Sequence, residues 1–476
     1  MQVLKFGGSS VANAENINKV VDIIKNKKAD TKTVVVVSAL GGITDLLLKT
    51  AALAEANDET YKSLLQEIET KHLQAVKDLI PVQQQSAALS LVKTICNEAE
   101  DICNGIFLLR ELSARTKDRI VSYGELLSSQ IIAAKLNAVG LVVEWKDARE
   151  IIVTDSGFGK ATVDFAASNK KTAAFFGASA SSLFVVPGFI AADKNNVTTT
   201  LGRGGSDYTA AILAAAVDAS VLEIWTDVSG MMTADPRLVN NIKHIPQISY
   251  QEAMELSHFG AKVIYPPTIQ PVMKKGIPVW IKNTFAPEEL GTVIKNEAAA
   301  TGTSIEGISS IHKIVLLSLE GSGMVGIPGF SKRLFEALAN ASINVILITQ
   351  GSSEHSICVG VDEHASAMAK EVVDKTFSYE IETNKVDPII VEKELSIVAI
   401  VGDNMKNHSG ISGKMFAALG RNGVSIRAIA QGSSERNISA VIATADVKKA
   451  INVLHEEFFE TTYKQVNLFI AGLGNV

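Results

Sequence analysis

The chain has 476 residues, of which 47% are hydrophobic and 20% charged, and its formal net charge is −6. This composition is typical of a globular protein with roughly two to four domains, and the acidic balance argues against nucleic acid as a partner. The three cysteines, Cys96, Cys103 and Cys358, lack metal-ligand spacing, so we expect reduced thiols, no metal site and a cytoplasmic location. Because a strand follows Met1 at once and no apolar run reaches roughly 18 residues, we expect neither a signal peptide nor a membrane helix.

Two glycine loops follow the first two predicted strands. Residues 3–6 predict a short strand that carries Lys5 into Gly7-Gly8-Ser9, and a helix is expected over residues 13–25. Residues 34–40 form a β-branched run, which is typical of a strand buried on both faces of a parallel sheet, and the loop 41–45 follows it. Backbone N–H groups of such loops can close on an anion. Here the lysine precedes the glycines, so this is not the Walker pattern.

A helical block separates these strands from the next ones. Residues 46–112 show helical spacing with one break at Pro81, which predicts an insertion over the site. A further helix is expected from Val121 to Leu136, with Glu125 in its first turn. Glu125 could bind a ligand, or it could be a solvated carboxylate that the helix dipole favours.

Strands are predicted at residues 141–145, 184–190, 197–201, 221–226 and 279–282, each alternating with helix, which indicates a doubly wound α/β sheet. Three more loops lie at strand ends: residues 202–207, residues 226–230 leading to 233–237, and residues 259–266. Arg203 in the first of these can bind a carboxylate or phosphate in two-pronged fashion, and the alternative is a tight turn with a solvated arginine. Two lysines and two arginines beside such loops fit a nucleoside triphosphate opposite a second anion.

An internal repeat follows the linker 287–308. Residues 348–354 (Ile-Thr-Gln-Gly-Ser-Ser-Glu) recur 81 residues later as 429–435 (Ile-Ala-Gln-Gly-Ser-Ser-Glu). With leading strands at 313–319 and 395–401, both copies read βαββα, which is most of a ferredoxin-like unit. The last eleven residues, 466–476, read as a strand entering Gly-x-Gly; alternatively, residues 466–470 are the fourth strand of the second unit.

Four motifs carry a resemblance to a known family: residues 5–10 (Lys-Phe-Gly-Gly-Ser-Ser), 201–207 (Leu-Gly-Arg-Gly-Gly-Ser-Asp), 225–230 (Trp-Thr-Asp-Val-x-Gly) and 259–266 (Phe-Gly-Ala-Lys-Val-x-x-Pro). In this order they resemble aspartate kinase of the amino-acid-kinase superfamily, and the repeats resemble tandem ACT domains. The resemblance implies a kinase domain over 1–300, ACT domains over 309–390 and 391–465, and the start of a homoserine dehydrogenase domain at 466–476. The chain would then be part of a bifunctional enzyme, with NADP used only by the untruncated parent.

The resemblance also implies the reaction and its residues. ATP with Mg2+ would phosphorylate the side chain of L-aspartate, the first step towards threonine, lysine and methionine, and an already ionised acceptor needs no general base. The catalytic set would be Lys5, Lys262 and Asp207, with Asp207 holding Lys5 or the water shell. The aspartate set would be Ser38, Thr44, Glu125, Arg203, Gly204 and Ser206. The ATP set would be Lys5, Gly7, Gly8, Ser9, Thr226, Asp227, Met232, Asp235, Arg237 and Lys262.

Mg2+ would bridge the ATP phosphates with few or no protein ligands. Met232 departs from the family, in which tyrosine is frequent at this position. Gln350 and Gln431 would bind an amino-acid effector, threonine first, unless the paired Gly-Ser-Ser turns only shape a hairpin, and paired ACT domains would make at least a homodimer. Two rivals stay open at this stage. One is a glutamate-, acetylglutamate- or carbamate-type kinase, and the other is an amino-acid sensor with a silent kinase domain.

Overall fold

The computed structural model describes residues 1–27, 31–259, 263–296, 305–351, 355–403, 405, 408–432 and 436–460. The chain forms two compact units. The first comprises Met1–Met231 and His244–Thr301, and the second comprises Met232–Lys243 and Gly302–Val476. Residues 232–243 therefore belong to the second unit, whereas the sequence assigned them to a domain over 1–300. Among the described residues, no helix is long and apolar enough to cross a membrane.

An eight-stranded sheet forms the centre of the first unit, in the order β11-β13-β12-β8-β1-β2-β5-β3. Its strands are β1 (Gln2–Phe6), β2 (Thr33–Val37), β3 (Glu144–Trp145), β5 (Leu183–Pro187), β8 (Val221–Thr226), β11 (Gln247–Ser249), β12 (Val279–Asn283) and β13 (Thr292–Lys295). The central strand β1 runs parallel to both neighbours, β2 and β8. Every residue of β1, β2 and β5 is buried, as expected for apolar parallel strands covered on both faces. The predicted α/β class is confirmed.

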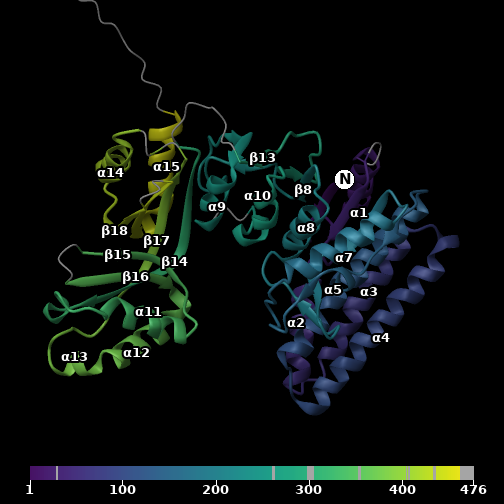
Figure 1. The fold of residues 1–476 in the computed structure, drawn as a ribbon, viewed down its shortest axis with the longest axis horizontal. Helices are drawn as coiled ribbons and strands as arrows, with labels where there is room; N and C mark the ends of the chain where they lie inside the picture. The colour runs from purple at the N-terminus through teal and green to yellow at the C-terminus, as the bar shows by residue number, and fades with distance from the viewer. Residues whose placement is uncertain are drawn as a thin grey trace, which may run out of the picture. The chain divides into compact units, whose positions relative to one another are not determined.

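Helices cover this sheet and form a layer beside it (Figure 1). The block after β2 consists of α2 (Ile43–Glu55), α3 (Tyr61–Leu79) and α4 (Gln85–Leu109), which pack on one another and on α5 (Ala114–Ala138). The block has a second break, at residues 56–60, where Asn57 adopts a φ of 58°, so the prediction of a single break was wrong. The other helices are α1 (Ala14–Lys27), α6 (Ala148–Ile151), α7 (Phe165–Ala178), α8 (Gly205–Ala216), α9 (Tyr250–His258) and α10 (Gln270–Lys275).

The start of α5 was also predicted wrongly. The helix begins at Ala114, seven residues before Val121, because the Ser113 side chain caps it by accepting a hydrogen bond from Thr116 N. Glu125 therefore lies in the middle of the helix and not in its first turn.

A second, three-stranded sheet precedes the Arg203 loop. It consists of β4 (Val153–Thr154), β6 (Ile190–Asp193) and β7 (Thr198–Thr200). The single strand predicted over 184–190 ends at Pro187, because Phe189 adopts a φ of 68° and turns the chain into β6. No helix lies between β5, β6 and β7. The prediction that each strand alternates with a helix is wrong here.

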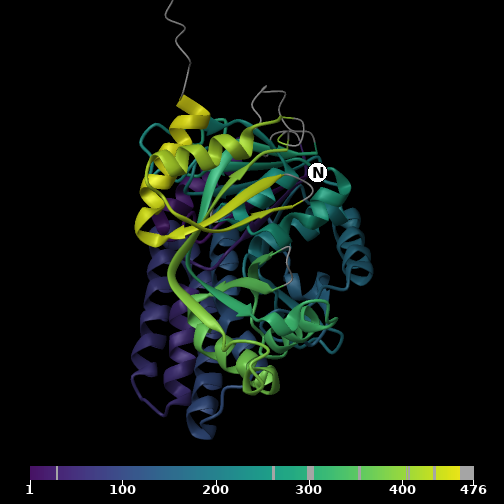
Figure 2. The same ribbon diagram turned by 90° about the vertical axis from the view of Figure 1, so that its left-hand side faces the viewer.

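One six-stranded antiparallel sheet spans the second unit, in the order β15-β16-β14-β17-β19-β18. Figure 2 shows its strands in green and yellow. They are β14 (Gly307–Glu320), β15 (Val345–Gln350), β16 (Ser356–Asp362), β17 (Ile390–Val401), β18 (Ile426–Gln431) and β19 (Asn437–Ala443). The helices are α11 (Phe330–Asn340), α12 (Ser366–Thr376), α13 (Ser378–Glu382), α14 (Ile411–Arg421) and α15 (Val447–His455), so the predicted βαββα repeat is present in both copies.

The two long strands β14 and β17 are shared between the repeats. Residues 307–311 of β14 pair with 397–401 of β17, and 314–318 pair with 390–395. Between these halves the register shifts, and both Lys313 and Glu394 adopt a φ of 59°. Val315 and Leu317 pack in one core, while Ile308 packs in another. Each repeat therefore has four strands, and residues 307–311 supply the fourth strand of the second; residues 466–470, the alternative named above, lie outside the described part of the chain.

Residues 232–243 pack on the second of these cores. Ala234 and Val239 lie among the residues of that core. Thr233 Oγ1 lies 2.9 Å from His455 Nε2, and Asn452 Nδ2 donates to the carbonyl of Leu238 at 2.9 Å. Strand β9 (Met231–Met232) and strand β10 (His244–Ile245) pair with each other at the two ends of this segment.

Candidate active site

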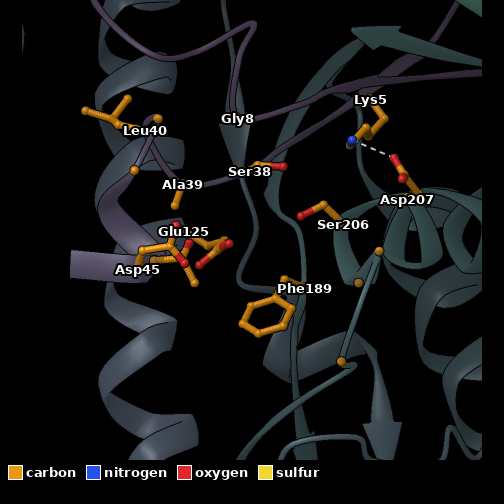
Figure 3. A pocket seen from close by; sticks show the side chains of 16 residues that line it. Lys5, Gly8, Ser38, Ala39, Leu40, Asp45, Glu125, Phe189, Ser206 and Asp207 are labelled. Atoms are coloured by element: carbon orange, nitrogen blue, oxygen red, sulfur yellow. Dashed lines mark ion pairs between the residues drawn. The ribbon is translucent and has the colours of Figure 1, made fainter. Parts of the chain in front are cut away.

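A pocket of about 350 Å3 lies at the carboxyl ends of β1 and β2 and at the start of α8 (Figure 3). Eight of the residues singled out from the sequence line it: Lys5, Gly8, Ser38, Thr44, Glu125, Gly204, Ser206 and Asp207. They come from β1 and the loop after it, from the β2–α2 loop and the first turn of α2, from α5 and from the start of α8, four places far apart in the chain. Open α/β sheets bind ligands beyond the carboxyl ends of their strands, so this is where a site is expected.

An ion pair joins the strand and the helix that face each other across the pocket edge. Lys5 Nζ lies 2.5 Å from Asp207 Oδ1, and the two side chains are only 9% and 15% exposed. Figure 3 shows the pair, with the ammonium of Lys5 held by the first turn of α8. A Cβ at Gly7 would lie 3.4 Å from Lys5 Nζ, so glycine keeps the space beside the ammonium open. The arrangement offers a fixed positive charge to an anion.

Glu125 supplies a buried acid on the opposite side of the pocket. The residue is 3% exposed, and burial raises its pKa to about 8, although backbone hydrogen bonds act in the other direction. Its Oε2 atom is buried and has no hydrogen-bond partner among the residues that the structure describes. The interpretation of Glu125 as a solvated carboxylate at a helix start is therefore wrong. A carboxyl group in this position is suited to receive a cationic ligand group.

The start of α8 and the β5–β6 turn form the floor. Gly204, with a φ of 68°, caps α8, and the Cβ of any other residue at position 205 would lie 2.6 Å from the Phe189 ring. Phe189 and Asp45 line the pocket but were not singled out from the sequence. A lone phenylalanine after Pro-Gly carries no sequence signal, whereas Asp45 belonged to the Gly41-Gly42 loop and could have been included on that ground. Lys71 of α3 donates to the Gly41 carbonyl at 2.6 Å and holds that loop.

Several predicted residues do not line this pocket. Arg203 is exposed, and its guanidinium lies 5.6 Å from the centre of the Tyr265 ring. Gly7 donates to the Trp225 carbonyl at 3.1 Å, and Ser9 accepts from the side chain of Asn16 at 2.9 Å. Thr226 and Asp227 lie at the end of β8, the strand beside β1, and share a hydrogen bond of 3.0 Å. Lys262 lies outside the described residues.

Three of the predicted nucleotide contacts belong to the second unit. Met232, Asp235 and Arg237 lie in the segment 232–243. Arg237 NH2 lies 2.6 Å from Asp235 Oδ2, and this hydrogen bond is the main reason why the pKa of Asp235 lies below its ordinary value. The side chains of Asp235 and Arg237 are thus already paired with each other.

The predicted effector residues occupy equivalent edges. Gln350 and Gln431 are exposed at the last positions of β15 and β18. These two edge strands lie side by side, as Figure 1 shows. Ser412 Oγ donates to Gln431 Oε1 at 3.4 Å. Within the described part of the chain, no group of three or more His, Cys, Asp and Glu side chains could hold a metal ion.

Comparison with known proteins shows the same two parts. Residues 1–283 match the amino acid kinase family, and residues 317–377 and 398–458 match the ACT domain. The chain is similar to the bifunctional aspartokinase/homoserine dehydrogenase 2 (chloroplastic) of Arabidopsis thaliana, with 35% identity over 463 residues, which cover 96% of this chain and 50% of that protein. It is also similar to aspartokinase 1 (chloroplastic) of Arabidopsis thaliana, with 31% identity over 99% of this chain and 83% of that protein.

A solved structure resembles the chain over nearly its whole length. It is E. coli aspartokinase III in complex with aspartate and ADP, described as the R-state, with a TM-score of 0.82, 30% identity and coverage of 97% of this chain and 100% of that one. The chain spans about half the length of the bifunctional relative.

Proposed function

The chain belongs to the amino acid kinase family, and within it to the aspartokinases, so we propose that it transfers the γ-phosphoryl group of ATP to the side-chain carboxylate of L-aspartate, giving 4-phospho-L-aspartate. The resemblance that the four loop motifs predicted is thereby confirmed. One observation carries the proposal: the Lys5–Asp207 pair and the buried Glu125 face one pocket from opposite sides. A negative and a positive ligand group are both accommodated there.

Phosphoryl transfer depends on positioning and on neutralised charge. Lys5 would bind the oxygens of the transferring group, and Asp207 would hold the ammonium of Lys5 in place. The backbone N–H groups of Gly8 and Ser9 would bind phosphate oxygens, whereas the N–H of Gly7, also predicted for this role, already donates to the Trp225 carbonyl. Thr226 and Asp227 at the neighbouring strand end would contact the nucleotide. Mg2+ would enter on the ATP phosphates and reduce their charge. Lys262 stays a predicted second clamp.

Aspartate would bind between α5 and the start of α8. Glu125 would pair with its ammonium group, and Arg203 with its α-carboxylate after turning from Tyr265. Ser38, Thr44, Gly204 and Ser206 line the remaining wall. Because the acceptor carboxylate is ionised near pH 7, no general base is needed. Met232, Asp235 and Arg237 remain proposed nucleotide contacts.

The test is aspartate-dependent turnover of Mg-ATP with the acyl phosphate trapped as hydroxamate. We expect turnover with aspartate and not with glutamate, acetylglutamate or carbamate, and a loss of roughly a thousandfold in Lys5→Met, because the fixed charge on the transferring oxygens is removed. Lys19→Met, at an exposed helix position where the ammonium pairs with Glu15 and lies over the Phe285 ring, is the matched control. Binding of an amino acid without turnover by the unchanged chain would favour the silent-sensor reading instead.

We further propose feedback regulation through the repeats, with threonine as the first candidate and Gln350 and Gln431 as its ligands. What supports this is their equivalent placement on two exposed edge strands that lie side by side. We also propose a homodimer through these edges, a cytoplasmic location, and a homoserine dehydrogenase part that uses NADP in a longer parent protein. Residues 466–476, which prompted the last of these, lie outside the described residues.

A further inference from the structure

Asp118, a residue outside the pocket, binds two segments of the first unit at once. It lies on α5 and is 2% exposed. Its carboxylate accepts from Gly159 N at 3.0 Å and 2.9 Å, one distance to each oxygen. Oδ2 also accepts from Thr200 N at 2.9 Å, and Oδ1 accepts from Thr200 Oγ1 at 2.9 Å. A buried carboxylate that accepts from two backbone N–H groups and a hydroxyl holds those groups in a narrow geometry.

Both segments lead directly to the pocket floor. Thr200 is the last residue of β7, and Gly202, two residues on, lines the pocket. A Cβ at Gly202 would lie 3.3 Å from the carbonyl oxygen of Gly159, so the two segments that Asp118 holds are packed against each other there. Leu201 N donates to the carbonyl of Phe189, another pocket residue, at 2.9 Å. Displacement of Thr200 would therefore move the start of the loop 202–207.

The same helix carries Glu125. Seven residues separate Asp118 from Glu125, which is close to two helical turns and about 10 Å along the axis, so both side chains project from one face of α5. One end of this stretch holds the loop that carries Gly204 and Ser206, and the other end presents the buried acid to the pocket. The helix thus sets the distance between the two sides of the proposed aspartate site.

We infer that Asp118 is a positioning residue for the amino-acid substrate, acting through Thr200 and Gly159 on the loop 202–207. This inference rests on the proposed function for its kinetic consequence, but its structural part stands without it. Asp118 does not line the pocket, so it acts without contact to the substrate. A misplacement of about 1 Å in such a loop can lower a rate roughly a hundredfold.

Two substitutions at this position separate geometry from charge. Asp118→Ala removes all these hydrogen bonds and is expected to raise the KM for aspartate roughly tenfold or more. The KM for ATP should change less than about twofold, because Thr226 and Asp227 lie at the end of another strand, β8. Asp118→Asn keeps an oxygen that accepts from both backbone N–H groups, and its NH2 can donate to the Thr200 hydroxyl. It is therefore expected to restore most of the affinity for aspartate.

Asp193→Ala is the matched control. Asp193 is 6% exposed and accepts from the backbone N–H groups of Asn195 and Val197 and from the Ser156 hydroxyl, all between 2.8 and 2.9 Å. It is the last residue of β6 and lies near the start of β7, whereas Thr200 is at the end of β7. Its loss removes the same kind of interaction without touching Thr200. We expect reduced stability with an unchanged KM for aspartate.

Amide hydrogen exchange over residues 200–207 gives a readout that does not depend on activity. Asp118→Ala should accelerate exchange there, while Asp118→Asn and Asp193→Ala should not. An unchanged aspartate KM in Asp118→Ala, or an equal rise in Asp193→Ala, would overturn the inference while leaving the kinase proposal intact. If the unchanged chain does not phosphorylate aspartate, the proposed function fails, and exchange alone decides on Asp118: unaltered exchange overturns it. Should Asp118→Ala not fold, Thr200→Val removes one of the same hydrogen bonds and must raise the KM in the same direction.

Discussion

Ionisation of Glu125 should link the binding of aspartate to pH. Burial raises the pKa of this carboxyl from 4.5 to about 8, so in the empty pocket at pH 7 about nine in ten molecules carry it protonated. An ammonium group that pairs with Glu125 requires the ionised form. Each aspartate bound at pH 7 should therefore release about 0.9 protons, and affinity should rise about tenfold per pH unit between about pH 6 and 7.5.

Stability should respond with the opposite sign. Because the folded-state pKa is raised, the folded protein binds more protons than the unfolded chain between about pH 4.5 and 8. The contribution of Glu125 to stability is therefore largest below this window and is lost as pH rises through it, by an amount of order 5 kcal/mol for the full shift. Glu125→Gln cannot ionise, so the difference in unfolding free energy between the variant and the unchanged chain should move in favour of the variant as pH rises.

The assay is isothermal titration calorimetry with aspartate in buffers of different ionisation enthalpy, together with urea unfolding across the same pH range. Glu125→Gln is expected to bind aspartate weakly and without proton release, and Asp45→Asn, at an exposed pocket position, should keep the proton release. The reasoning would be refuted if aspartate binding released no proton and its affinity did not change between pH 6 and 7.5. It would mean either that the carboxyl is already ionised in the empty pocket or that it does not meet the ammonium.

Three further outcomes are expected. Gly188→Ala would place a Cβ 2.6 Å from the Cβ of Ser206, so it should raise the KM for aspartate several-fold in steady-state assays. Gly177→Ala, whose added Cβ would have no neighbouring atom of the described residues within 4 Å, should leave this KM unchanged. Gln350→Ala should raise the threonine concentration that halves turnover by about tenfold, and unchanged inhibition would exclude this residue as a ligand. His455→Ala removes the contacts with Thr233 and Glu460 and should destabilise the second unit by roughly 2 to 4 kcal/mol in denaturant unfolding. His364→Ala, at an exposed position, should not. An unfolding midpoint of His455→Ala equal to that of the unchanged chain would contradict the packing described for residues 232–243.

The sequence alone determined those features that depend on neighbouring residues. Apolar β-branched runs such as residues 33–37 form buried parallel strands because every residue of such a strand faces a covered side. Glycines after strands mark the loops at the sheet edge, and the repeat at 348–354 and 429–435 predicts two alike units. Together with the resemblance to aspartate kinase, these signals were enough to predict that Lys5, Ser38, Ser206 and Asp207 line one pocket.

Only the tertiary structure decided how distant segments combine. The burial that raises the pKa of Glu125 depends on the loops packed around α5, and the break at Phe189 depends on its contact with Gly205. Each of the long strands β14 and β17 contributes one half to each repeat, and residues 232–243 belong to the second unit. Both arrangements depend on contacts between segments that are far apart in the sequence. Local composition carries no record of such partners, because burial and strand register are properties of contacts between segments and not of either segment by itself.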